Sequence, residues 1–118
     1  MNVEEIIFNK YSDFGYKSVS GELYLPFKWA LKLVEECNEQ EIAVIGLDFV
    51  HINSTKIVPV SPLNGVDCSG LLYKHKIWVE VVKECNDFVI NVLINEQNRD
   101  STQYCNFVLL SISEWGSN

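Results

Sequence analysis

Cysteine and histidine are the residue types in this chain with the greatest capacity for nucleophilic or metal chemistry. The chain has four cysteines, which lie far apart in the sequence: Cys37, Cys68, Cys85 and Cys105. No two of them form a Cys-x-x-Cys pair, and the two histidines, His51 and His75, do not have the spacing of metal ligands on one helix face. The sequence therefore predicts neither a metal site nor a cofactor, and it favours a reducing compartment.

Cys68 has the surroundings most typical of a nucleophile, in the run Asp67-Cys68-Ser69-Gly70-Leu71-Leu72. The run resembles the signature around the reactive cysteine of NlpC/P60 cell-wall peptidases, which implies a cysteine peptidase or amidase. A thiol nucleophile needs a base, and those peptidases supply a histidine well after the cysteine. Here His75 follows after seven residues and no later histidine exists, so His51 is left for a permuted arrangement. We interpret Cys68 as non-catalytic, with the peptidase as the alternative.

Composition and charge narrow the class of partner. The 118 residues have a formal net charge of −7, and Arg99 is the only arginine. Because phosphate binding relies on clustered Lys and Arg, this balance argues against a nucleic-acid partner. There is no apolar run of membrane-spanning length and no secretory signal at the start, so we expect a cytoplasmic protein without membrane contact. An acidic surface instead attracts a basic protein.

Acidic residues recur on the outward side of the clearest predicted helix, at Glu80, Glu84 and Asp87. Like charges at this spacing repel one another, so this acidic stripe is a candidate partner-binding face. Asp67 and Tyr73, in a predicted surface loop, are further candidate contacts. A merely solvated helix face remains the alternative interpretation.

Asp48 interrupts an apolar strand. A buried carboxylate is costly unless it is hydrogen-bonded or paired, so we expect Asp48 to accept nearby donors near the end of the strand. The alternative is that Asp48 belongs to a binding surface.

Helical and strand periodicities predict a single α+β domain with the element order α-α-β-β-α-β. The predicted helices cover residues 3–11, 26–37 and 77–93, and the predicted strands cover residues 42–50, 56–60 and 105–112. Residues 12–25 and 61–76 are predicted connections.

The strands are expected to form a three-stranded, mainly antiparallel sheet with the helices packed on it. Residues 42–50 form a near-continuous apolar run, which predicts a middle strand that is covered on both faces. Pro59 cannot donate to a ladder, so its strand belongs at an edge.

Residues 21–48 resemble the Immunity protein 40 family of bacterial polymorphic toxin systems. The resemblance rests on three runs: Glu22-Leu23-Tyr24-Leu25, the helical Ala30-Leu31-Lys32-Leu33-Val34-Glu35-Glu36, and Ile42-Ala43-Val44-Ile45-Gly46-Leu47-Asp48. It implies that residues 1–118 form one immunity-protein-like domain and not an enzyme. Such a domain neutralises a cognate toxin, often a nuclease, inside the producing cell by stoichiometric occlusion. A small adaptor or regulatory domain is the further alternative.

Overall fold

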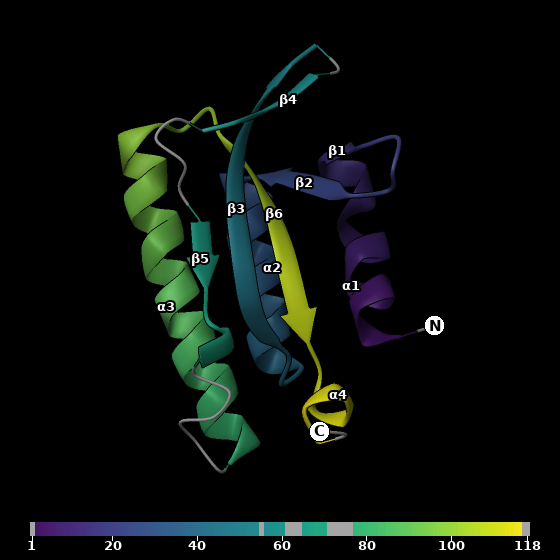
Figure 1. The fold of residues 1–118 in the computed structure, drawn as a ribbon, viewed down its shortest axis with the longest axis vertical. Coiled ribbons are helices and arrows are strands. Elements are labelled where there is room, and N and C mark those ends of the chain that lie inside the picture. Colours follow the sequence, from purple (N-terminus) through teal and green to yellow (C-terminus); the bar gives the residue numbers. More distant parts are fainter. Residues whose placement is uncertain (1, 55, 61–64, 71–76, 117–118) are drawn as a thin grey trace.

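The computed structural model describes residues 2–54, 56–60, 65–70 and 77–116, which form one α+β fold around a curled antiparallel sheet (Figure 1). The helices are α1 (Val3–Tyr11), the 3-10 helix η1 (Ser12–Phe14), α2 (Phe27–Glu39), α3 (Trp78–Arg99) and α4 (Ile112–Gly116). The strands are β1 (Tyr16–Lys17), β2 (Leu23–Pro26), β3 (Ala43–Asn53), β4 (Lys56–Pro59), β5 (Gly65–Asp67) and β6 (Tyr104–Leu110).

The sheet has the strand order β1-β2-β6-β3-β4, and β5 also pairs with β3. β6 runs antiparallel along one side of β3, whereas β4 and β5 follow one another along its other side, also antiparallel. The predicted middle position of residues 42–50 is therefore confirmed. Pro59 lies in β4 at the edge of the sheet, as its missing N–H requires.

The prediction of only three strands is wrong. β1, β2 and β5 are two, four and three residues long, so they are too short to show a strand period in the sequence. β2 becomes a strand by pairing with β6, where Leu25 lies opposite Cys105. Because these partners are 80 positions apart, no local pattern signals the pairing. The two-residue β1 pairs with β2 alone, so five strands form the body of the sheet.

Helices α2 and α3 pack against each other and cover one face of the sheet, and α1 packs beside α2 on the side away from α3 (Figure 1). α2 begins directly after Pro26, which suits a helix start. Asn2 caps the start of α1, where its side chain accepts the N–H of Glu5 at 2.8 Å. The core between the helices and the sheet consists of fully or nearly fully buried apolar residues, including Ala30, Leu33, Val34, Val81, Cys85, Val89, Leu93, Leu47, Phe49 and Phe107.

The expectation that the middle strand is covered on both faces is wrong. Leu47 and Phe49 are buried against the helices, but Asp48 between them is exposed. Val50 lies on the same side as Asp48 and is buried without a covering layer, because its cross-strand neighbours Pro59 and Tyr104 flank it. This face of β3 is therefore open to solvent around Asp48, despite the apolar sequence.

Candidate functional site

The acidic stripe predicted on α3 exists, but its charge is partly compensated. Glu80 and Asp87 are exposed and Glu84 is half-buried. Lys83 forms an ion pair with Asp87, with 2.7 Å between Nζ and Oδ2, and this carboxylate raises the pKa of the lysine. Near Asp87, this face of α3 therefore carries charges of both signs.

A hollow between β5 and α3 brings together two of the predicted contact residues, Asp67 and Glu84. It has a volume of about 390 Å³ and is also lined by Cys68, Gly70 and the half-exposed Phe88. Asp67 Oδ1 accepts the N–H of Ser69 at 2.9 Å, and its hydrogen bonds with Ser69 lower the pKa of this carboxyl.

Tyr73 and His75 lie outside the described residues, so the structure does not place these two sequence-based candidates. For the same reason, the predicted loop 61–76 is described only at β5 and at the residues that follow it, up to Gly70.

Cys68 is held away from His51, the histidine that a permuted catalytic arrangement would use. Cys68 is 3% exposed, and its N–H donates to the carbonyl of Ile45 on β3 at 2.7 Å. His51 lies six residues further along the same strand, a separation of about 20 Å at the usual rise of about 3.3 Å per residue. The two side chains are therefore too far apart for direct proton transfer.

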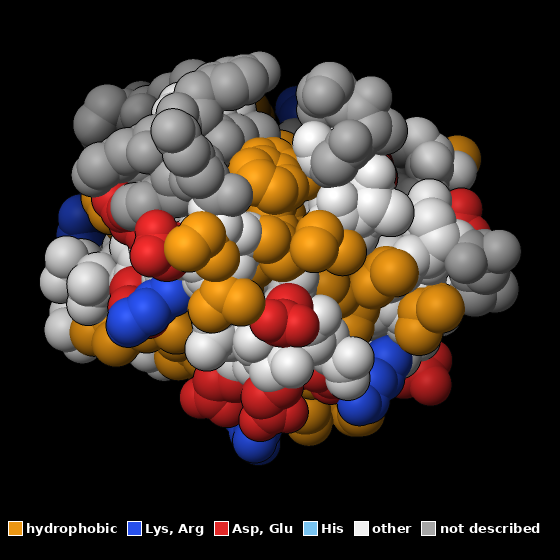
Figure 2. Space-filling model, turned by 90° about the horizontal axis from the view of Figure 1, so that it is seen from below, with side chains coloured by type: hydrophobic (Ala, Val, Ile, Leu, Met, Phe, Trp, Pro, Cys, Tyr) orange, Lys and Arg blue, Asp and Glu red, His pale blue; other side chains and the backbone are white. Residues whose placement is uncertain are grey.

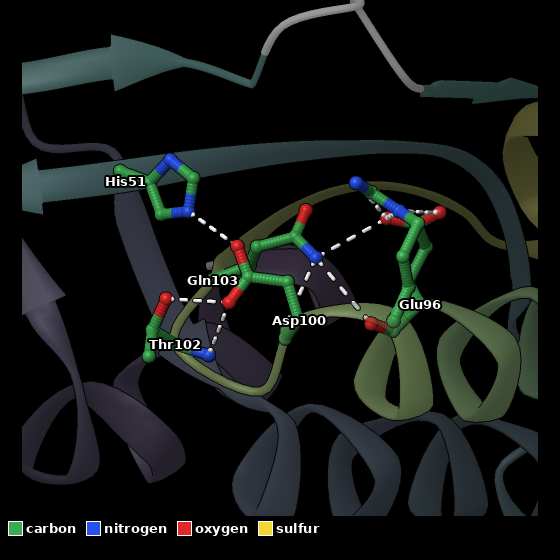
Figure 3. Close-up of polar contacts among 6 residues, drawn as sticks. His51, Glu96, Asp100, Thr102 and Gln103 are labelled. Carbon is green, nitrogen blue, oxygen red and sulfur yellow. Dashed lines mark hydrogen bonds and ion pairs between the residues drawn. The ribbon is translucent and has the colours of Figure 1, made fainter.

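His51 belongs instead to a polar cluster that joins the end of α3 to β3 (Figure 3). Its Nε2 lies 2.9 Å from Asp100 Oδ2, and the Thr102 hydroxyl donates to Asp100 Oδ1 at 2.6 Å. The hydrogen bonds from Thr102, and then that from His51, lower the pKa of Asp100 to about 2. Because the hydroxyl donates to the carboxylate and not to the imidazole, these groups do not form a nucleophile–base relay.

Gln103 belongs to the same cluster and lies in the interior of the protein, where it is 1% exposed. Its Nε2 donates to Asp100 O at 2.9 Å and to Glu96 Oε2 at 3.2 Å, and Glu96 also pairs with Arg99 at 2.7 Å (Figure 3). Among the described residues, Gln103 Oε1 has no hydrogen-bond partner. The contacts fix how the chain turns from α3 into β6, so we interpret the cluster as structural.

The open face of the sheet has a second hollow, of about 320 Å³, which we call the acidic groove. Its lining residues come from β2, β3, β4 and β6, with one residue just before β2: Glu22, Tyr24, Asp48, Phe49, Val50, Ile57, Pro59 and Asn106. Asp48 and Asn106 lie opposite each other in the β3–β6 register. The Asn106 Nδ2 donates to Leu23 O at 3.1 Å, which fixes the amide at the groove wall.

Two carboxylates converge on Tyr24 in the acidic groove. The Tyr24 hydroxyl donates to Glu22 Oε2 at 2.8 Å. Burial, followed by the hydrogen bond and charge of Glu22 and the charge of Asp48, raises the pKa of Tyr24 to about 12. Within the described part of the chain, no Lys, Arg or His forms an ion pair with Glu22 or Asp48. The acidic groove therefore presents uncompensated negative charge beside apolar walls.

A neighbouring hollow under α1 adjoins the acidic groove. The two hollows share Glu22 and Asn106, and the second is also lined by Glu5 and Phe8 of α1 and by Lys17 of β1.

Asp48 was singled out in the sequence as a polar residue within an apolar strand, but the expectation of a partnered, buried carboxylate is wrong. Its side chain is exposed because it points to the uncovered face of β3. Glu22, Tyr24 and Asn106 were not predicted as site residues. The polar position at Asp48 signals an outward strand face, but the β3–β6 pairing places Asn106 opposite it, and the non-local β2–β6 pairing brings Glu22 and Tyr24 into the same groove.

Hydrophobic side chains gather at the end of the molecule where α3 and α1 begin and α4 lies (Figure 2). The exposed apolar residues of these segments include Val3, Ile6, Ile77, Val79 and Ile112. Behind them, the rings of Trp78 and Trp115 lie 5.3 Å apart and join α4 to α3. Apolar surfaces of this kind are common at protein contacts.

Among the described residues, no group of three or more His, Cys, Asp or Glu is arranged to hold a metal ion. In the same part of the chain, no helix combines the length and the apolar character needed to cross a membrane. Comparisons of the chain with protein-family models, curated proteins and solved structures gave no significant match.

Proposed function

We propose that this chain is an immunity protein that neutralises a cognate bacterial toxin by stoichiometric occlusion, with the acidic groove as its principal contact surface. The observation that supports this proposal is the convergence of Glu22 and Asp48 without a cationic partner among the described residues. Two exposed carboxylates without counter-charges are complementary to a Lys or Arg from another protein. Acting in the cytoplasm of the producing cell, the domain would cover a basic cleft of the toxin.

The chemistry of the acidic groove favours an arginine or lysine side chain as the inserted group. Carboxylates bind guanidinium through paired hydrogen bonds, and the apolar walls at Ile57 and Pro59 suit the methylene stem of the same side chain. A nuclease cleft is rich in such cations because it must bind phosphates. The net charge of −7 adds long-range attraction, which acts mainly on the association rate.

The segment that resembles the immunity family also contributes both carboxylates of the acidic groove. Residues 21–48 run through β2, α2 and into β3, so Glu22 stands near the start of the resembling segment and Asp48 at its end. The fold returns these two ends to the same hollow, with Tyr24 between them. The resemblance and the groove geometry therefore point to the same residues, although each rests on a different observation.

The test begins with the gene next to the one that encodes this chain. We expect the adjacent upstream gene to encode a toxin with a basic C-terminal domain, and co-expression of this chain to protect cells from that domain. Glu22→Gln combined with Asp48→Asn should weaken protection, whereas Glu35→Gln on the exposed side of α2 should not. Absence of a neighbouring toxin, or full protection by the groove variant, would contradict the proposal. Binding to an unrelated protein would favour the adaptor alternative.

A further inference from the structure

Two of the four cysteines are in direct contact, although 17 positions separate them in the sequence. The thiol of Cys85 on α3 hydrogen-bonds to Cys68, which follows β5. Both residues belong to the buried core, where Cys68 is 3% exposed and Cys85 is fully buried. Cys37 and Cys105 are buried elsewhere in that core and serve as internal controls.

Two independent hydrogen bonds hold these cysteines at the same point of the sheet. Cys68 N–H donates to Ile45 O on β3 at 2.7 Å. Asn86, the residue after Cys85, accepts the N–H of Val44 on its side-chain Oδ1 at 2.8 Å. Consecutive residues of β3 therefore bind the backbone of Cys68 and the side chain of the residue next to Cys85. Both contacts place the segment after β5 and this turn of α3 at the same point of the sheet.

The two thiols have different environments, which assigns them different roles. Cys68 lines the hollow between β5 and α3, together with Asp67, Glu84 and Phe88, whereas Cys85 is not among the residues that line it. The hydrogen bond from Cys85 lowers the pKa of Cys68 and raises that of Cys85. Cys68 is therefore the better nucleophile of the pair, and Cys85 is the thiol that follows.

We propose that Cys68 and Cys85 form a reversible redox site, in which a small peroxide converts the contacting thiols into a disulfide. The Cys68 thiolate attacks one oxygen of hydrogen peroxide, the O–O bond breaks and hydroxide leaves, which gives a sulfenic acid on Cys68. The sulfur of Cys85 then attacks the sulfur of Cys68 and displaces the second hydroxide. The protons of the two thiols convert both hydroxides to water. The peroxide is thus reduced by the two electrons that the thiols lose.

This redox site is distinct from the acidic groove and does not depend on the proposed immunity function. Because a hydrogen bond already links the two thiols, formation of the disulfide, with its S–S length of about 2.05 Å, needs the two side chains to approach each other only locally. It would join the segment after β5 covalently to the middle of α3. The hollow around Cys68 is therefore the surface whose shape would respond to an oxidant.

The test is disulfide mapping on the full chain after brief treatment with hydrogen peroxide. Remaining thiols are blocked with N-ethylmaleimide, and the digested protein is analysed by mass spectrometry. Before blocking, we expect the intact mass to fall by two hydrogen atoms. After digestion, we expect a peptide that links Cys68 to Cys85, and dithiothreitol should restore both thiols. The double variant Cys37→Ser, Cys105→Ser should give the same linkage.

The intermediate provides a second readout that uses a conservative variant. Cys85→Ser should stop the reaction at the sulfenic acid on Cys68, which dimedone traps, whereas Cys68→Ser should show no sulfenic acid on Cys85. Circular dichroism verifies that the variants are folded, and the wild-type mapping does not require them. If wild-type protein gives a different pairing, or Cys68 is oxidised to sulfinic acid without a linkage, the proposal is overturned.

Discussion

Asn86 on α3 supplies the hydrogen-bond partner of Val44 at the irregular point of β3. The pairing of β3 with β6 shifts register between Val44 and Gly46, and there the Asn86 Oδ1 accepts the Val44 N–H at 2.8 Å. The Asn86 Nδ2 donates to Ile42 O at 3.0 Å, and the side chain is fully buried. One amide thus joins the long helix to the middle strand and satisfies two buried backbone groups.

Replacing this amide should be costly. Asn86→Ala leaves the Val44 N–H and the Ile42 carbonyl without partners, and each such buried group costs about 1–3 kcal/mol. We expect the free energy of unfolding to fall by about 2–4 kcal/mol in urea titrations. Asn91→Ala, at an exposed position of the same helix, is the matched control and should change it by less than about 0.5 kcal/mol. Equal effects of the two substitutions would show that the Asn86 contacts do not stabilise the fold.

Asn86 also illustrates which parts of the fold the sequence can predict. The long apolar periods of α1 and α3 predicted these helices correctly, and α1 has the predicted bounds. In contrast, nothing local distinguishes the buried Asn86 from the exposed Asn91, because the need for a buried amide arises from the irregular pairing of a distant strand. Short strands such as β2 are hidden for the same reason, since their partners are remote in sequence.

The candidate site was predictable only in part. Asp48 could be recognised because a carboxylate within an apolar strand is unusual, and its exposure follows from the alternation of strand faces. Of the predicted acidic stripe, Glu80 and Asp87 are exposed and Glu84 is half-buried, and the Lys83–Asp87 ion pair neutralises part of its charge. Glu22 acquires its place from the pairing of β2 with β6, which requires the tertiary structure.

A carboxyl pair between α1 and α4 should make stability depend on pH. Burial, and then the hydrogen bond and charge of Glu114, raise the pKa of Glu4 from 4.5 to about 7, so the folded protein retains a proton that the unfolded chain releases. This stabilisation is complete below about pH 4.5 and is lost as the pH rises through 7. Glu4→Gln mimics the protonated form and should flatten the dependence of urea midpoints between pH 5 and pH 8, values chosen around the pKa of about 7.

The control for this pair is Glu39→Gln, at the exposed end of α2, which should retain the wild-type dependence. Identical pH profiles for wild type and Glu4→Gln would show that the two carboxyls do not share a proton.

The hydrogen bonds of Asp100 should give stability the opposite pH dependence, so that stability is lost in acid. Hydrogen bonds from Thr102 and His51 lower the pKa of Asp100 from 3.8 to about 2, so its contribution is present above pH 3.8 and is lost as the pH falls through 2. Thr102→Val removes the largest cause of this shift. We expect the variant to begin acid unfolding at a higher pH than wild type, measured by circular dichroism. Superimposable acid transitions would contradict this role of the Thr102 hydroxyl.

Cys68 should not be required for protection against the toxin. Cys68 is only 3% exposed, and His51 is bound to Asp100 at a distant point of β3. We expect Cys68→Ala to retain full protection in the co-expression assay, with a modest loss of stability from the lost packing. A folded Cys68→Ala protein that gives no protection would favour the peptidase alternative.

The most direct test of the acidic groove is the association rate with the purified toxin domain at low and high salt. Exposed charges add little to the stability of the fold, so Glu22→Gln with Asp48→Asn should leave the melting temperature nearly unchanged. The same pair should slow association by about tenfold at low salt, and the difference should shrink as salt screens the charges. The α3 stripe variant, with Glu80→Gln, Glu84→Gln and Asp87→Asn, should have the smaller effect. An unchanged rate for the groove variant at low salt, with slowing by the stripe variant, would place the interface on α3 and contradict the proposed role of the acidic groove.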